Sequence, residues 1–180
     1  VTLTSSSDLQ VPPTISMPQG ANSAVFPVTP VDNNLLDGTR TAQVTASAPT
    51  FSASNGMTTV SDDDAHHFTI DEITTQEIRN RPFNITIRAI TIDNKPATAF
   101  QSTAALTASL SGAAVPVSPV ETAPFVSGVW TGPVALGAFG NAIVVTATSQ
   151  GITGSSGPIY ITTGWASRLV WDQFQIGRAH

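Results

Sequence analysis

The sequence predicts an all-β protein made of two tandem β-sandwich domains, and three observations support this. Apolar and polar residues alternate in short runs, as expected for strands that bury one face. Groups of Gly, Pro, Asn and Asp separate these runs at regular intervals. No stretch of a dozen residues places apolar side chains at helical spacing behind a capping residue. Short strands with this regular punctuation are typical of sandwiches.

The strands follow from the alternation, beginning with residues 1–4 and continuing with residues 24–28 and 84–92. Other runs with the same pattern are residues 41–46, 57–60, 103–110, 128–136, 142–148 and 159–162. Residues 71–79 come nearest to a helix, but their length and Thr pair favour a loop. The glycine-rich residues 151–157 are expected to form a hairpin loop.

Composition excludes several functions. Charged residues make up only 11% of the chain, the net charge is −5, and Lys95 is the one lysine. Such a chain lacks a cationic surface for a phosphate backbone, so nucleic acid is not an expected partner. The absence of cysteine excludes disulfides, thiolate metal sites and cysteine nucleophiles. No apolar run approaches the ~18 residues of a transmembrane helix, so no transmembrane segment is expected.

An internal similarity indicates the domain boundaries. Residues 65–73 resemble residues 166–174 in their apolar alternation and in two identities, at an offset of 101 residues. A period near 100 residues is the length of one immunoglobulin-type sandwich. We therefore predict one domain over residues 1–64, a second over residues 65–164, and the start of a further repeat or a C-terminal strand over residues 165–180.

Four segments in order resemble the Calx-beta family and its bacterial surface relatives: residues 1–6, 15–26, 31–39 and 60–64. The resemblance covers about the first third of the chain and implies a calcium-binding type of β-sandwich. Two departures accompany it. The family's opening strands would precede Val1, and Asn33 and Asn34 stand in the loop where calcium-binding members place consecutive acids, which implies fewer ions or weaker binding.

Residues 65–164 resemble a bacterial immunoglobulin-like repeat, chiefly at residues 82–89, 93–96 and 128–132. This second resemblance is architectural and carries no functional residue.

The candidate metal site joins two acidic segments. Calcium prefers six to eight hard oxygen ligands, and Asp62, Asp63 and Asp64 bring three carboxylates whose mutual repulsion a cation would relieve. The Calx-beta resemblance implies that these residues meet the loop of Asp32, Asn33 and Asp37 at the end of the sandwich beside the second domain. A calcium ion there would stiffen the linker. The alternative is a solvated hinge with ordinary turn residues.

Other candidates are weaker. His66 and His67 could attract zinc or nickel, but neighbours on a strand point to opposite faces, which favours ordinary surface histidines. No nucleophile elbow or phosphate loop occurs, so no enzyme is expected. Trp130, Trp165 and Trp171 could stack against sugars, although core packing is the stronger interpretation.

These features predict a non-catalytic structural or adhesive segment of a secreted or cell-surface protein, with neighbouring repeats as its partners. Two alternatives remain open. An accessory module of a secreted hydrolase would bind polysaccharide, whereas a filament subunit would donate the strand at residues 169–174 to another copy of the chain.

Overall fold

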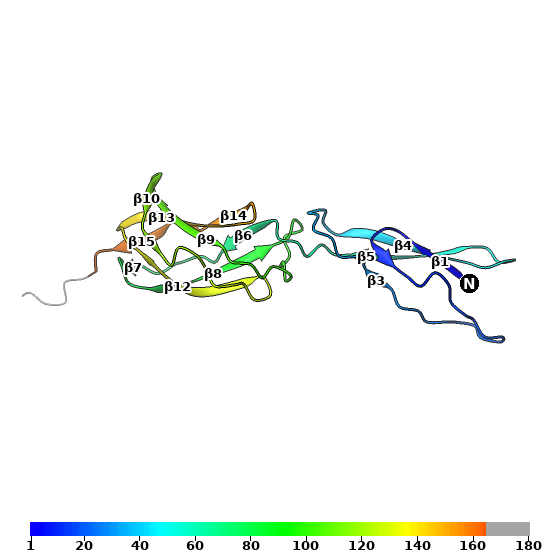
Figure 1. Cartoon of the computed structure of the whole chain (residues 1–180). Helices are drawn as coiled ribbons and strands as arrows, with labels where there is room; N and C mark the ends of the chain where they lie inside the picture. Colours follow the sequence, from blue (N-terminus) through cyan, green and yellow to red (C-terminus); the bar gives the residue numbers. More distant parts are fainter. Residues whose placement is uncertain (165–180) are drawn as a thin grey trace, which may run out of the picture.

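The computed structural model describes residues 1–164, and within them it contains fifteen β-strands and no helix. This confirms the all-β prediction. The chain forms two bodies joined end to end (Figure 1). We call residues 1–64 the N-terminal unit and residues 65–164 the C-terminal unit. No helix long and apolar enough to cross a membrane is found among the described residues.

The N-terminal unit is a thin β-structure. Its main sheet has the order β1-β4-β5, formed by Thr2–Ser5, Arg40–Ser47 and Ser54–Val60. A second sheet pairs β2 (Leu9–Gln10) with β3 (Thr29–Pro30). Only Leu3, Leu9 and Ala42 are buried apolar residues in this unit, so its core is small.

The C-terminal unit is a sandwich of two sheets, in which every described strand pair is antiparallel except β7 with β15. One sheet has the order β10-β9-β13-β15-β7, with β14 also paired to β13, and the other has the order β11-β12-β8-β6. The bounds of these strands are β6 His67–Ile70, β7 Glu77–Ile78, β8 Phe83–Ile90, β9 Ala105–Leu110, β10 Ala113–Val115, β11 Val117–Ser118, β12 Val129–Leu136, β13 Gly140–Ser149, β14 Ile152–Ser155 and β15 Ile159–Thr162.

Alternation along the strands builds the core of the C-terminal unit. In β8 the side chains of Phe83, Ile85 and Ile87 are buried while those of Asn84 and Thr86 are not. The rings of Phe68, Phe100 and Phe125 meet near one end of the sandwich, with centroids 5.1–5.5 Å apart. Every residue of this core lies in the C-terminal unit, so the two units share no hydrophobic core.

Several local predictions need correction. Residues 24–28 form no strand, because Val25 is fully exposed and has no sheet to pack on, and Pro27 has no N–H to donate. Residues 151–157 are not simply a loop, since they contain β14. The segment 71–79 is not helical, as expected, but it is not entirely a loop, since it contains β7, which pairs in parallel with β15.

The predicted further repeat at residues 165–180, with Trp165, Trp171 and the donor strand at residues 169–174, lies outside the described residues.

Candidate functional site

The residues predicted to bind calcium border one hollow of about 390 Å³ at the end of the N-terminal unit. Its lining includes all six predicted residues: Asp32, Asn33, Asp37, Asp62, Asp63 and Asp64. The two segments come together because β4 begins just after Asp37 and β5 ends just before Asp62, so these antiparallel neighbours bring both ends to one edge of the sheet.

Asp62 ties the two acidic segments together. Its carboxylate accepts a hydrogen bond from the backbone N–H of Gly38 at 3.2 Å and another from the N–H of Asp64 at 3.1 Å. Gly38 has a φ of +71°, a conformation that glycine adopts without strain. The hydrogen bond from the Gly38 N–H to the Asp62 carboxylate therefore holds the turn at Asp37 against the aspartate triplet.

The carboxylates around the hollow repel one another. Burial raises the pKa of Asp64, and the nearby charges of Asp62, Asp63, Asp32 and Asp37 raise it further. The guanidinium of Arg40 also borders the hollow, where it pairs with Asp37 and, at 3.3 Å, with Asp8. Within residues 1–164, its buried Nε atom finds no hydrogen-bond partner. Arg40 thus neutralises part of the negative charge.

These donors suit a hard cation, because they are carboxylate and amide oxygens around one cavity. In the described part of the chain, no three His, Asp or Glu side chains are grouped closely enough to hold a metal ion. Calcium binding at this hollow therefore stays a prediction, and it requires side chains to turn inward and Asp37 to be shared with Arg40.

A second contact fixes the junction between the units. The backbone N–H of Thr39 donates a hydrogen bond of 2.6 Å to the Asp93 carboxylate, and the Lys95 ammonium donates one of 3.2 Å to the Thr39 hydroxyl. Hydrogen bonds from Thr39, aided by the charge of Lys95, hold the pKa of Asp93 below its ordinary value. A Cβ on Gly38 would lie 3.1 Å from Asp93 Oδ1, so the turn and the hairpin approach closely.

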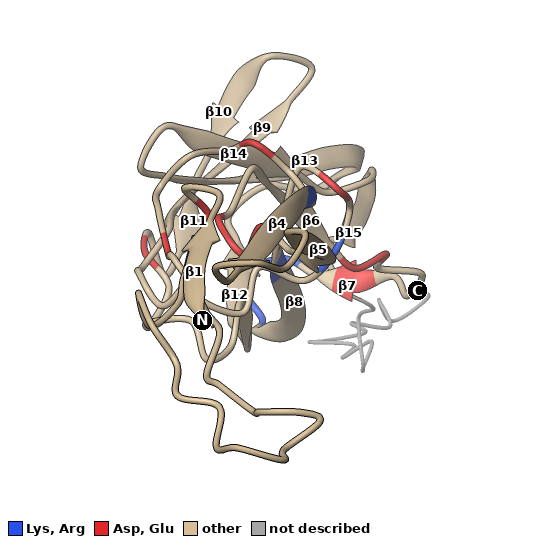
Figure 2. Ribbon diagram, turned by 90° about the vertical axis from the view of Figure 1, so that its right-hand side faces the viewer, with Lys and Arg blue, Asp and Glu red and all other residues tan. Residues whose placement is uncertain are grey.

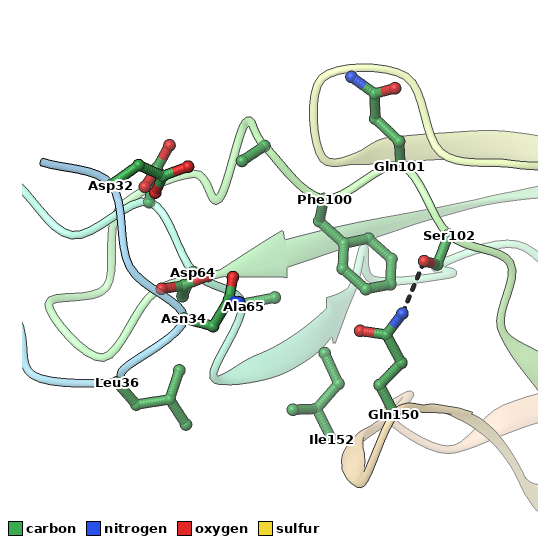
Figure 3. A pocket seen from close by; sticks show the side chains of 12 residues that line it. Asp32, Asn34, Leu36, Asp64, Ala65, Phe100, Gln101, Ser102, Gln150 and Ile152 are labelled. Carbon is green, nitrogen blue, oxygen red and sulfur yellow. Dashed lines mark hydrogen bonds between the residues drawn. The ribbon is translucent and has the colours of Figure 1, made fainter.

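A hollow of about 490 Å³ lies between the units beside this contact. Figure 3 shows Asp32, Asn34 and Leu36 on one side of it and Phe100 and Ile152 on the other. Gln150 donates a hydrogen bond of 2.8 Å to the Ser102 hydroxyl across the C-terminal side. Asp32, Asp63 and Asp64 border both hollows, so a cation in one would change the charge on the wall of the other.

Sequence reasoning missed Arg40, Thr39 and the contact made by Asp93 and Lys95. Residues 93–96 contributed only to the architectural resemblance, although Asp93 and Lys95, two residues apart, are a signal of a polar contact. Nothing in a single sequence pairs that hairpin with Thr39, because the two lie 54 residues apart.

Two further candidates have clear outcomes. The prediction that His66 and His67 point apart is wrong, since their Nδ1 atoms are 3.2 Å apart and their rings meet edge-on. The reason is that β6 begins only at His67, so strand alternation does not apply to His66. Trp130 is buried with 8% exposure, which confirms core packing and excludes it as a sugar platform.

Two solved structures show a distant similarity to this chain. The D00-D0 domain of intimin is similar over 90% of this chain and 85% of its own, with 14% identity and a TM-score of 0.42. Domains 4 and 5 of the S-layer protein SbsC are similar over 67% of this chain and 65% of their own, with 12% identity and a TM-score of 0.34. No family model and no curated protein matches the sequence.

Proposed function

We propose that the chain is a non-catalytic spacer segment of a secreted or cell-surface protein, in which sandwich units follow one another end to end. The observation that carries this proposal is the junction, where the turn at Gly38 and Thr39 is bonded to Asp93 and Lys95. An elongated arrangement with a polar, hydrogen-bonded joint keeps its units at a fixed distance and orientation. A spacer in a structural or adhesive protein needs this property.

The joint has no buried hydrophobic core of its own among the described residues. The units share no hydrophobic core, and interfaces of this polar kind permit relative domain motion unless specific contacts restrain it. Asp93 and Lys95 supply that restraint by holding Thr39 from the C-terminal unit. The stiffness of the segment is then set by a few named hydrogen bonds, which makes the proposal testable by single substitutions.

We further propose that calcium stiffens this joint. Its ligands would come from Asp32, Asn33, Asp37 and the triplet at residues 62–64, which already line one cavity. Because Asp62 is bonded to Gly38, next to Thr39, order imposed on the acidic hollow would extend directly to the interunit contact. Calcium would supply charge neutralisation and would lower the pKa of Asp64.

Replacing Asp93 with alanine is expected to broaden the distribution of distances between the units. The chain has no cysteine, so spin labels can be placed on Gly56→Cys and Gly157→Cys, two glycines with no neighbouring atom within 4 Å of an added Cβ. Double electron–electron resonance then reports the spread. The matched control is Asp71→Ala, which removes an ion pair with Arg88 inside the C-terminal unit and should leave the spread unchanged.

The same measurement has a predicted pH dependence. The pKa of Asp93 is lowered in the folded chain because its ionised form accepts the hydrogen bonds from Thr39. The contribution of Asp93 to the stability of the joint is therefore present above the ordinary carboxyl pKa and is lost as pH falls through the lowered value. The spread in the parent chain should therefore widen under acid while circular dichroism stays native. An equally narrow distribution in Asp93→Ala at neutral pH would contradict the proposed joint.

Asp64→Asn separates the calcium proposal from the hinge alternative. Because the pKa of Asp64 is raised in the folded chain, the folded state favours the protonated carboxyl and is destabilised when Asp64 ionises. The free energy of unfolding therefore falls as pH rises from the ordinary carboxyl pKa through the raised value. At pH 7 the substitution should raise the melting temperature without calcium by about 1–2 °C. It should also reduce the further rise that calcium produces in the parent chain.

The control for that comparison is Glu72→Gln, which removes an exposed acid away from the hollow and should preserve the calcium response. Scanning calorimetry with calcium or with a chelator measures both variants. If calcium shifts no transition in the parent chain, the acidic hollow is a solvated hinge and the calcium proposal fails, while the spacer proposal still rests on the resonance experiment.

A further inference from the structure

One sheet of the C-terminal unit is almost free of charged side chains. Strands β9, β10, β13, β14 and β15 contain no Asp, Glu, Lys or Arg. The exception is Glu77 on edge strand β7, which is coloured red in Figure 2. In a chain of net charge −5, five neighbouring strands without a charged residue are a specific surface property.

Hydroxyl groups form rows across this face. Thr107, Thr146 and Ser155 lie opposite one another on three neighbouring strands. The hydroxyls of Thr146 and Ser155 are 2.8 Å apart. Each hydroxyl can donate one hydrogen bond and accept others, so the rows keep capacity for a partner that carries hydroxyl groups.

Two exposed aromatic rings lie at the end of the same sheet. Phe139, directly before β13, is 59% exposed, and Tyr160 in β15 is 49% exposed. Tyr160 alternates with the buried Ile159 and Ile161 along β15 and therefore faces outward, while Phe139 directly precedes Gly140, the residue that pairs with Ile161. Both rings border an open hollow of about 700 Å³, together with Asn141 and Thr162, and none of its lining residues within 1–164 is charged.

The opposite sheet is built differently. On its outer face Arg88 of β8 forms a two-bonded ion pair with Asp71, and both side chains are nearly half exposed. The acids of the N-terminal unit gather at the junction. The neutral, hydroxyl-rich surface with an aromatic pair therefore belongs to one face of one unit.

From this pattern we propose that the outer face of β9, β13, β14 and β15 binds a neutral polysaccharide, with Phe139 and Tyr160 as its stacking platform. Sugar rings present apolar C–H faces that suit exposed aromatic rings, and their hydroxyls match the Asn141 and Thr162 side chains. Binding sites of this type combine aromatic area with a few polar groups that fix orientation. The strands β9, β13, β14 and β15 themselves carry no cationic side chain, which favours a neutral glycan over an acidic one.

A protein partner fits less well. Protein interfaces concentrate apolar and aromatic residues with Arg at their centre, whereas this face offers two large apolar rings beside threonine and serine rows. The proposal goes beyond the spacer function and is independent of the junction, because none of the residues that carry it lies within the acidic hollow.

The test is native affinity electrophoresis of the full chain in gels that contain β-glucan, mannan or dextran, together with pull-down on cellulose and chitin. Retention is expected on at least one neutral polysaccharide and not on alginate, an acidic control. The double variant Phe139→Ala/Tyr160→Ala should weaken retention about tenfold or more, as expected when aromatic anchors are removed from a binding site. Its melting temperature should stay within the range of the parent chain.

The matched control is Phe51→Ala, which removes a ring with 77% exposure from the N-terminal unit and should leave retention intact. No retention on any neutral polysaccharide would overturn the proposal, as would equal retention of the parent chain and the double variant. Sedimentation provides another decisive result, because a dimer that the double variant abolishes would identify a second copy as the occupant.

Discussion

Gly154→Val is expected to destabilise the C-terminal unit by at least about 3 kcal/mol, because the new side chain has no space. A Cβ at this position in β14 would lie 2.0 Å from the backbone oxygen of Phe68 and 2.5 Å from its carbonyl carbon. Backbone atoms cannot move aside as a flexible side chain can. Urea unfolding followed by far-ultraviolet circular dichroism should show a lower midpoint with little change in slope.

A control lies three residues away in the same glycine-rich segment. Gly157 has no neighbouring atom within 4 Å of an added Cβ and does not require a positive φ. Gly157→Val should therefore unfold at nearly the parent midpoint. Similar losses of stability in Gly154→Val and Gly157→Val would mean that side chains are disfavoured throughout this segment. The close approach of β14 to β6 would then not explain the effect.

This close approach also shows where sequence reasoning reached its limit. The glycine-rich residues 151–157 were interpreted as a loop because glycine usually punctuates chains. In fact Gly154 belongs to a strand, and its missing side chain allows β14 to lie directly against Phe68 of β6. A glycine inside a strand can mark such an approach, but a single sequence does not identify its partner.

In the C-terminal unit alternation predicted β8, β9, β12, β13 and β15, because these strands bury one face in a shared core. The expected run at residues 128–136 corresponds to β12, in which Trp130, Val134 and Leu136 are buried. The same reasoning failed at residues 24–28 in the N-terminal unit. Val25 belongs to an alternating run there, but its side chain is fully exposed because no second sheet packs against it.

The meeting of the two acidic segments was implied by the Calx-beta resemblance, and the strand pairing gives its physical reason. The loop before β4 and the segment after β5 meet because antiparallel neighbours share an edge, so their acids gather as expected. The pairing of Arg40 with Asp8 could not be predicted, since it depends on how the segment before β2 approaches the start of β4, whereas Asp37 lies only three residues before Arg40. The contact of Asp93 with Thr39 depends on how two separate units approach each other.

Phe125→Ala is expected to destabilise the C-terminal unit by about 3–5 kcal/mol, through lost burial and the cavity that remains. Phe125 is 2% exposed, and its ring packs against Phe100 at 5.1 Å and Phe68 at 5.5 Å between centroids. The neighbouring substitution Val126→Ala, at a side chain with 75% exposure, should be nearly neutral. Urea midpoints of the two variants give the difference.

The location of that loss tests whether the two units are independent. Because the aromatic cluster contacts no buried residue of the N-terminal unit, hydrogen exchange in Phe125→Ala should accelerate at the amides of β8 and β13 and stay unchanged at those of β4. Equal acceleration in β4 would mean that both units unfold as one. In that case the junction would be a rigid cooperative interface, and the few polar bonds at Thr39 could not be what sets its stiffness.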